Sequence, residues 1–558
     1  MARWLGIAGG LAATTAAIWT SSAPTLPQKV LSYFSRYPDA ERLQCRPFLP
    51  PSIFLDDPPD AEEPEIQDAS RKLRQVIDQL EAADGFETIA VAVTTAHGPI
   101  FLDTRGQLRS NETGSASVTP ESQYRVASVS KLTPVFIGWL FQQQGIISWD
   151  DRVKDYLPRL SESWEETTIY DLATHMSGLG RDWPPGTVRD WPYSADGGGA
   201  PPYNGHGFPT VESLLRGIAE NKAVTPPWTE PTYSNTGAGL LGLVLQEASR
   251  RHHGTAEAPT FPELARREVF GPLSMDGSHF LVAEENAGNV VVPSFMAEVV
   301  DQDFTDTMNA AGGQFSSLSD TARFAQFLLH PGRKEGLLKQ KTVNRWFKPV
   351  VSFEEDDLTE LGLMWEIIKH PDAHGRFRHV YQKLGLMFAF GSCISLQPGS
   401  SYGIVVHMTG VFPDAGAVCW ETLQAFQPAI DSILAKRARK LYVGEWSSAD
   451  GLAKAITSLH KGTLFLDQLT YNGTNVLETF QMEGRFALRS TARKDEFRID
   501  TGFPGGFNGK PHLGCYAYWN GKDDWGVKNG FPINLISFGG DLDNRSLGLP
   551  SLGAALRR

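Results

Sequence analysis

The residues with the clearest chemical potential are a serine and a lysine three positions apart, in Ser128-Val-Ser-Lys131. A serine hydroxyl is barely ionised at neutral pH, so it becomes a nucleophile only when a base lies close to it. Residues three apart share one face of a helix, so Lys131 can reach Ser128. A lysine acts as a base when burial lowers its pKa, and the apolar Val135, Phe136 and Trp139 predict such burial. The pair therefore predicts attack of Ser128 on an acyl group, with Lys131 removing its proton.

A second motif, Tyr233-Ser-Asn235, carries groups that would assist this attack. Nearby lysines would draw the phenol of Tyr233 toward phenolate, which lets it shuttle protons. The amide of Asn235 can bond both a lysine and a substrate. The alternative interpretation of this motif is a turn before a helix, with Asn235 as the N-cap.

A third motif is Lys383-Leu-Gly385, within the segment YQKLGLMFAFGS, where its function would require a strand. Lys383 and Gly385 point to the same face of such a strand. The lysine would supply positive charge, and the glycine would let a substrate approach the backbone. The next backbone N–H, at Leu386, would pair with that of Ser128 as an oxyanion hole. A solvated strand lysine is the alternative for Lys383.

The segments around these motifs indicate how they are positioned. A helical period covers residues 70–84, and residues 85–93 and 98–104 are typical of paired strands. A helical region follows from about 128 to 250, and it is interrupted at 181–209 by a segment rich in Gly, Pro and aromatic residues. That segment is either a lid over the site or a surface loop. Further predicted strands cover 361–368, 377–381, 386–397 and 401–409, and a long amphipathic helix covers 417–440.

Length and composition limit the classes of protein. The chain has 558 residues, which predicts two or three domains. Its net charge of −13 gives an acidic surface that repels phosphate backbones, so no nucleic-acid partner is expected. Clustered metal-ligand spacings are absent from the sequence, so neither a metal nor a cofactor is expected.

The chain is expected to enter the secretory pathway. Residues 1–24 have the anatomy of a signal peptide, and an uncleaved signal anchor that would hold the protein at a membrane is the alternative. Residues 25–68 are rich in proline and acid and are interpreted as a linker. Three glycosylation sequons, at Asn111, Asn472 and Asn544, favour the same route. Four cysteines allow three full pairings, which the sequence leaves open.

Each motif is weak alone, but their surroundings are specific. From about 66 to 440 the chain resembles the β-lactamase-related serine hydrolases, which include class C β-lactamases, D-alanyl-D-alanine carboxypeptidases and lovastatin-type acyltransferases. The resemblance rests on the motifs in order and on the segments 144–158, 167–179, 310–329 and 361–367. It implies an α/β sandwich, in which an antiparallel sheet is flanked by helices and a helical subdomain is inserted between strands, over residues 69–440. Residues 441–558 resemble the lipocalin-like tail of some members and predict a small all-β barrel.

The resemblance implies that Ser128 is the nucleophile, Lys131 the base and Tyr233 the proton relay. It also implies that Asn235 is an orienting group and that Lys383 gives electrostatic support. It departs at Leu384, where the family usually carries a hydroxyl that would hold a substrate carboxylate. This favours a small hydrophobic ester, thioester or amide as substrate, with water or an alcohol or amine as acceptor, in a setting compatible with secondary metabolism. The alternative is a catalytically degenerate member that binds ligands or acts as a scaffold.

Overall fold

The computed structural model describes residues 45–202, 204–480, 484–501 and 515–558, so the expected signal segment 1–24 lies outside the described residues. The described chain forms two compact units. The first contains Pro51–Ala373 and Phe377–Ile433. The second contains Leu434–Arg558, His374–Arg376 and the described residues before Pro51. The division between the units therefore falls a few residues before residue 441, at which the sequence predicted the second domain to begin.

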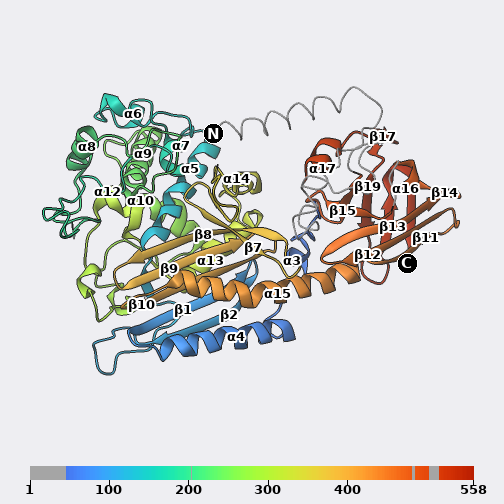
Figure 1. Cartoon of the computed structure of the whole chain (residues 1–558), viewed down its shortest axis with the longest axis horizontal. Helices are drawn as coiled ribbons and strands as arrows, with labels where there is room; N and C mark the ends of the chain where they lie inside the picture. The colour runs from blue at the N-terminus through green and yellow to red at the C-terminus, as the bar shows by residue number, and fades with distance from the viewer. Residues whose placement is uncertain (1–44, 203, 481–483, 502–514) are drawn as a thin grey trace. The chain divides into compact units, whose positions relative to one another are not determined.

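One antiparallel sheet of eight strands organises the first unit (Figure 1). In spatial order its strands are β2 (Gly98–Gly106), β1 (Phe86–Thr95), β10 (Tyr402–Gly410), β9 (Phe390–Gln397), β8 (Phe377–Met387), β7 (Glu366–Pro371), β6 (Thr359–Leu361) and β5 (Val351–Ser352). The predicted hairpin is confirmed, because β1 pairs with β2. The predicted strand over 361–368 is divided into β6 and β7, and β8 continues to Met387 where a break was expected.

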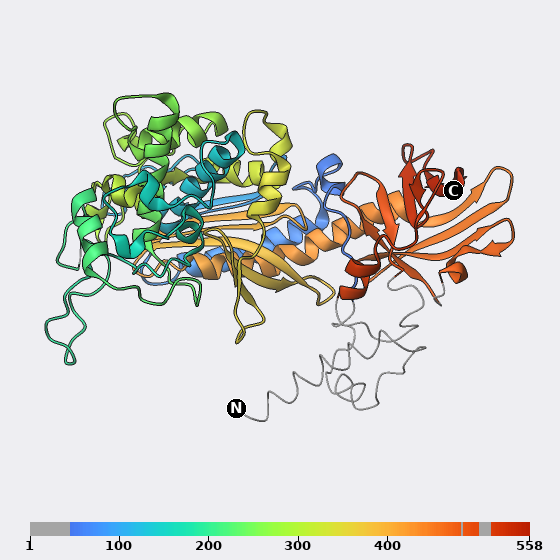
Figure 2. The same cartoon turned by 90° about the horizontal axis from the view of Figure 1, so that it is seen from above.

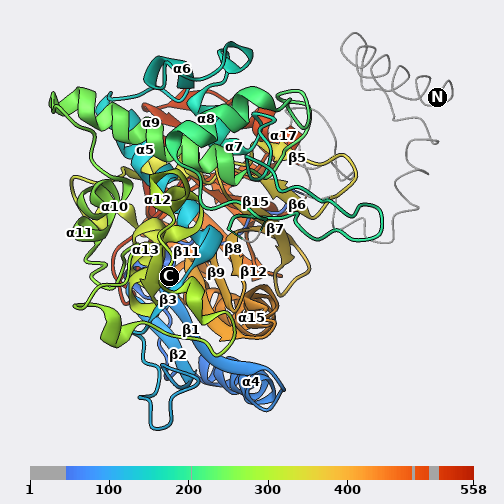
Figure 3. The ribbon, with the colours of Figure 1, turned by 90° about the vertical axis from the view of Figure 1, so that its left-hand side faces the viewer.

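Helices cover both faces of this sheet, as Figure 3 shows. On one face lie α4 (Pro64–Glu81) and the part of α15 (Ala415–Tyr442) that belongs to this unit, and on the other lies α13 (Leu318–Leu329). The α15 bounds agree with the predicted helix over 417–440. This arrangement confirms the predicted layers of an antiparallel sheet flanked by helices.

The chain between β2 and β5 forms the predicted helical subdomain. Its main helices are α5 (Leu132–Gln144), α7 (Ile169–Thr174), α8 (Val211–Glu220) and α9 (Asn235–His253). The shorter elements are β3 (Gln123–Arg125), η2 (Ala127–Lys131), α6 (Val153–Tyr156), η3 (Glu162–Trp164), α10 (Phe261–Ala265), η4 (Arg266–Phe270), α11 (Gly271–Leu273), η5 (Ala287–Asn289), η6 (Ala297–Val299), α12 (Thr305–Met308), η7 (Asn309–Gly313), β4 (Phe315–Ser317), η8 (Pro331–Arg333) and α14 (Gln340–Trp346).

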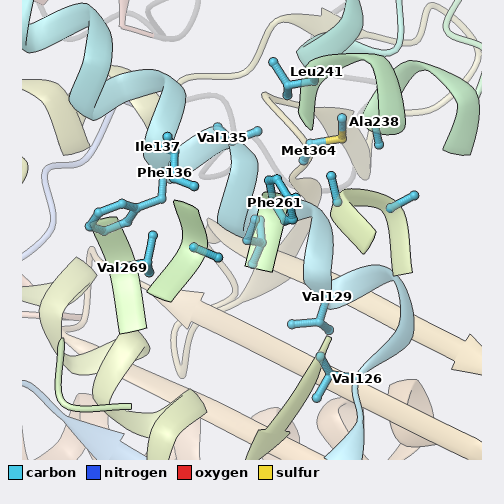
Figure 4. Close-up of a cluster of buried hydrophobic side chains, with 14 of the residues drawn as sticks. Val126, Val129, Val135, Phe136, Ile137, Ala238, Leu241, Phe261, Val269 and Met364 are labelled. Atoms are coloured by element: carbon cyan, nitrogen blue, oxygen red, sulfur yellow. The ribbon is translucent and has the colours of Figure 1, made fainter. Parts of the chain in front are cut away.

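Helix α5 forms the centre of this subdomain, because every residue from Leu132 to Phe141 is buried. A helix that is apolar on all sides is stable only when other elements surround it. Figure 4 shows Phe136 from α5, Leu241 from α9 and Phe261 from α10 in one apolar cluster. The nucleophile motif immediately precedes α5, so this packing fixes the position of the motif.

The predicted linker over 25–68 is wrong for part of its length. Residues 25–44 lie outside the described residues, but Ile53–Asp56 form helix α3 and α4 already begins at Pro64. Proline fits the first turn of a helix, where its missing N–H has no partner to lose. Ile66 is fully buried and extends the apolar face of α4 by two turns before Leu73. The many acidic residues and prolines around Ile66 obscured the apolar spacing of this helix in the sequence.

The second unit is a small all-β domain, as expected. Its strands β12 (Ala453–His460), β11 (Gly444–Ser448), β21 (Ala554–Arg557), β20 (Ser546–Leu549), β19 (Leu535–Gly539), β16 (Glu496–Ile499), β15 (Phe486–Ser490) and β13 (Thr463–Tyr471) form one sheet that closes where β12 pairs with β13. Figure 2 shows these orange and red strands from a second direction. The shorter elements are β14 (Thr474–Asn475), α16 (Val476–Thr479), α17 (Tyr516–Gly521), β17 (Val527–Lys528), β18 (Phe531–Pro532) and η9 (Pro550–Leu552).

The four cysteines form two disulfides, Cys45–Cys515 and Cys393–Cys419. The first joins two segments of the second unit, and the second joins β9 to α15 within the first unit. Within the described ranges, no helix is both long and apolar enough to cross a membrane.

Candidate active site

Ser128 lies in η2, a tight helical turn that runs directly into α5. With three residues per turn, such a helix places positions i and i+3 one above the other. The Nζ of Lys131 is 3.2 Å from the Oγ of Ser128. Ala127, just before the serine, has a φ of 46°, in the left-handed region that non-glycine residues rarely adopt. The sequence predicted the contact through an α-helix, and the structure makes it through the tighter turn.

Lys131 is completely buried, and its ammonium has three polar partners. Besides Ser128 Oγ, it donates to Asn235 Oδ1 at 2.7 Å and to the carbonyl oxygen of Ala311 at 2.6 Å. Burial lowers the pKa of Lys131 below its usual value, and the nearby Lys383 lowers it further, although Tyr233 opposes this shift. The lysine is thus held against the serine in a setting that favours its neutral, basic form.

Tyr233 also contacts Ser128, from the end of the loop before α9. Its hydroxyl donates a hydrogen bond to Ser128 Oγ at 2.5 Å. The ammonium groups of Lys131 and Lys383 lie 4.8 and 5.1 Å from the centre of its ring. Burial raises the pKa of Tyr233, but the two cations outweigh this effect and bring the pKa down to about 8. The phenol can therefore exchange its proton near neutral pH.

Asn235 is the first residue of α9 and is not its N-cap. The N-cap is Ser234, whose Oγ accepts the backbone N–H of Gly237. The amide of Asn235 is instead fixed from both ends, because its Oδ1 accepts from Lys131 and its Nδ2 donates to Asp182 Oδ1 at 2.9 Å. Asp182 is buried. No sequence pattern singled it out, since its partner lies 53 residues further along the chain.

Lys383 lies in β8 with a side chain that is only 1% exposed. Its ammonium donates to a carboxylate oxygen of Glu366 and to its neighbour's carbonyl oxygen, Leu384 O, at 2.9 Å. Burial would lower the pKa of Lys383, but Tyr233 and Glu366 outweigh burial and raise it. Lys383 is therefore a buried, paired cation and not the solvated strand lysine of the alternative interpretation.

Gly385 lies where β8 passes the nucleophile turn. A Cβ at this position would be 2.3 Å from the carbonyl oxygen of Val126 and 3.1 Å from the backbone nitrogen of Ser128. Such distances leave no room for a side chain. The absence of a side chain is what lets β8 lie against the backbone of the nucleophile.

The backbone N–H groups of β8 alternate between its two edges. The N–H of Leu384 points away from β9 and donates to Glu366 Oε2 at 2.9 Å. The N–H of Leu386, two residues on, therefore points to the same edge. Strand β7 does not cover that edge at Leu386, because its first residue, Glu366, pairs with Gln382. The Leu386 side chain is 70% exposed.

Leu384 projects to the face of β8 opposite to Lys383 and Gly385. Its two methyl groups lie 3.4 Å from the position that a Cβ at Gly416 would take, in the first turn of α15. Its partner across the sheet is Cys393, which is bonded to Cys419 of the same helix. The side chain that distinguishes the third motif thus packs beneath the strand, while its N–H is held by Glu366.

The loop at 181–209 divides its aromatic residues between core and solvent. Trp183 is buried against Trp164, with ring centres 5.7 Å apart, so it does not belong to a lid. Trp191 and Tyr193 are strongly exposed. Tyr203 of the same loop lies outside the described residues.

A family model described as Beta-lactamase matches residues 73–427 of this chain. The beta-lactamase-like protein str6 of Strobilurus tenacellus is 32% identical over 308 residues, which cover 53% of this chain and 97% of that protein. The probable hydrolase M10 of a Phoma species is 21% identical, and the match covers 70% of this chain and 67% of that protein.

Solved structures show the same fold. A class C β-lactamase from Rhodobacter sphaeroides is similar with a TM-score of 0.50 and 20% identity, over 66% of this chain and 100% of that chain. The octameric penicillin-binding protein homologue from Pyrococcus abyssi is similar with a TM-score of 0.51 and 16% identity, over 88% of this chain and 99% of that chain.

Proposed function

The chain belongs to the beta-lactamase family, and on that premise we propose that it is a serine hydrolase or acyltransferase that works through an acyl-enzyme on Ser128. The observation that carries the proposal is the pair of contacts at Ser128 Oγ, with Lys131 Nζ at 3.2 Å and the Tyr233 hydroxyl at 2.5 Å. A nucleophile flanked by two groups with lowered pKa values has a route for its proton.

In the acylation step, Lys131 or Tyr233 takes the proton of Ser128 while Oγ bonds to the acyl carbon. The carbonyl oxygen becomes an oxyanion, and the N–H groups of Ser128 and Leu386 stabilise it. When the tetrahedral intermediate collapses, the bond to the leaving group breaks and the leaving alcohol, thiol or amine receives the proton through Tyr233. Asn235 holds Lys131 in place throughout, and Lys383 stabilises the phenolate form of Tyr233.

In the second step, water or an alcohol or amine acceptor attacks the acyl carbon. The same bases remove the acceptor's proton, and Ser128 Oγ leaves and regains a proton. The product is a free acid after attack by water, or a new ester or amide after attack by the other acceptors. Leu384, which stands where the family usually carries a hydroxyl that would hold a substrate carboxylate, supports a small hydrophobic ester, thioester or amide as donor.

The second candidate function is a degenerate, ligand-binding member of the family. Leu384 in the third motif kept this candidate open, but its side chain packs against α15 and leaves the contacts of Ser128 intact. Burying the charges of two lysines at one site costs free energy unless each lysine is paired. A binding protein without catalysis has no need for two buried lysines, so the burial of Lys131 and Lys383 counts against this candidate.

A secretory location is part of the proposal. Two disulfides are typical of oxidising compartments. The sequon residues Asn111, Asn472 and Asn544 are all exposed, as glycosylation requires. Digestion of the protein from its native host with an N-glycosidase, followed by intact mass, tests this part of the proposal. A loss of hexose mass supports the secretory route, and an unchanged mass contradicts it.

The experiment that tests the enzyme is covalent labelling with a fluorophosphonate probe, read by intact mass and peptide mapping. We expect one label on Ser128, none on Ser128→Ala, and labelling at least about 100-fold slower in Lys131→Ala. Ser163→Ala, an exposed serine in the same subdomain, is the matched control and should label like the wild type. Labelling that is absent from the wild type, or that persists in Ser128→Ala, would refute the proposal.

A further inference from the structure

The carboxylate of Glu366 occupies two donors at the strand edge beside the nucleophile, the Lys383 ammonium and the Leu384 N–H. One of its oxygens pairs with Lys383 Nζ, and the other accepts the N–H of Leu384 at 2.9 Å. An ammonium and a neighbouring backbone N–H are together a typical receptor for a carboxylate. In this protein the carboxylate of Glu366 itself occupies that receptor.

The pair presents a negative group and not a positive one to an entering substrate. The Lys383 side chain is 1% exposed, whereas the Glu366 side chain is 29% exposed. A ligand that approaches this part of the edge therefore meets the carboxylate, with the ammonium beneath it. A second carboxylate there would face a like charge and would find its hydrogen-bond donors already taken.

The other charged groups described around Ser128 do not offer a substrate carboxylate the same donors. Lys131 is buried and committed to Ser128, Asn235 and Ala311. Asp182 is buried behind Asn235. Arg181 is the exposed cation, with its guanidinium 4.7 Å over the ring of Tyr233 and a side chain that is 67% exposed. It belongs to the helical subdomain, so it does not replace the donors that Glu366 occupies on β8.

We infer that Glu366 determines the substrate class, and that the site selects acyl donors without a carboxylate next to the reacting carbonyl. This inference rests on the proposed function, because it concerns the donor that acylates Ser128. Glu366 is thus a specificity-determining residue that the sequence motifs do not include. A substrate carboxylate is thus disfavoured twice, because it meets a like charge and because the donors that would bind it are occupied.

The test compares two esters of similar length, 4-nitrophenyl butyrate and the mono-4-nitrophenyl ester of succinic acid, as a ratio of kcat/KM values. In the wild type we expect the neutral ester to be preferred. Glu366→Gln should shift the ratio at least about tenfold toward the carboxylated ester, because it removes the like charge and frees the lysine. Glu366→Asp keeps the charge and should retain the original preference.

Glu360→Gln is the matched control. Glu360 is also ion-paired with a lysine of the same sheet, Lys369 at 3.0 Å, but it lies on β6 away from Ser128. A ratio that stays within about twofold of the wild type in Glu366→Gln, while both esters are still cleaved, overturns the inference and leaves the proposed function standing. Cleavage that survives Ser128→Ala shows instead that the proposed function has failed.

A binding measurement covers the case in which neither ester is cleaved. In the Ser128→Ala background, the dissociation constants of phenylacetate and phenylacetamide are measured by ligand-observed NMR with and without Glu366→Gln. We expect Glu366→Gln to strengthen phenylacetate binding relative to phenylacetamide. If the relative affinity does not change, Glu366 does not exclude carboxylates and the inference is wrong.

Discussion

The hydroxyl of Tyr233 donates to Ser128 Oγ across 2.5 Å, although the two residues are 105 positions apart in the chain. Lys131 contacts the same oxygen, so the serine has two neighbours that can accept its proton. Both have pKa values below their usual ranges, but for different reasons. Burial is the main cause for Lys131, whereas two neighbouring cations act against burial for Tyr233.

The pKa of Tyr233 predicts the pH dependence of the reaction. Below about pH 8 the phenol is protonated and cannot accept a proton, and above that pH the phenolate can. The kcat/KM for a neutral ester should therefore rise with pH and level off above about 8. Tyr233→Phe should lower kcat/KM about 100-fold or more and remove this rise.

Tyr156→Phe is the control for this series, because Tyr156 bonds Asp151 in the same unit and has no contact with Ser128 among its described partners. A rise with pH that persists unchanged in Tyr233→Phe would assign it to Lys131. Because the titrations of Tyr233 and Lys131 are coupled, the apparent pKa measured for the wild type belongs to the pair and not to either residue alone.

Asp182 is predicted to be a positioning residue. Asp182→Ala removes the acceptor that fixes the amide of Asn235, so Asn235 can turn away from Lys131. We expect kcat to fall about 10- to 100-fold with little change in KM, because misplacement near the chemistry affects the reacting step. Asp182→Asn keeps a carbonyl oxygen for the same bond and should retain most of the activity.

The control for Asp182 is Asp196→Ala, an exposed acid further along the same loop. Equal losses in Asp182→Ala and Asp182→Asn would mean that the negative charge matters, and not the orientation of Asn235. A thermal melt of each variant separates either effect from unfolding.

Gly385→Ala should abolish fluorophosphonate labelling. The added methyl group would lie 2.3 Å from Val126 O and 3.1 Å from Ser128 N, so either β8 or the nucleophile turn must move. Gly399→Ala is the matched control, because a methyl group there would meet the guanidinium of Arg378 at 3.3 Å and no backbone atom within 4 Å. Normal labelling in Gly385→Ala would show that the turn tolerates displacement and would contradict the geometry argued here.

The Cys393–Cys419 disulfide is predicted to stabilise the first unit. It closes a loop with a sequence separation of 26 residues, for which chain entropy gives about 3.5 kcal/mol. The double variant Cys393→Ser, Cys419→Ser should lower the free energy of unfolding by that order in urea titrations. A midpoint equal to that of the wild type would indicate that packing alone holds β9 against α15.

The individual strands and the nucleophile pair were predictable because they depend on local patterns, whereas the layers followed from the family resemblance. Alternating strands and the three-residue spacing of Ser128 and Lys131 are properties of short segments. Strand alternation also implied that Leu384 lies on the face opposite to Lys383, so this signal was present in the sequence and was not used. The early start of α4 was missed because acids and prolines surround its few apolar residues.

Asp182 and Glu366 could not be found in this way. Asp182 acts on Asn235, 53 residues away, and Glu366 acts on Lys383 across a strand pair. Each is one acid among 64 in the chain, and only the tertiary contact distinguishes it. The role of Tyr233 was inferred through the family resemblance, because its distance from Ser128 in the chain carries no spacing signal.

The alternation along β8 divides its positions into those that laboratory evolution can vary and those that it cannot. A mutant library at residue 386 would change an exposed side chain at the strand edge and leave the backbone N–H in place. Variation at residue 384 would be limited by the helix beneath it, and position 385 would accept glycine alone. Efforts to redirect this scaffold to new acyl groups should therefore begin with Glu366, whose side chain reaches solvent beside Lys383, whereas Leu386 shares the far face of the strand with Leu384.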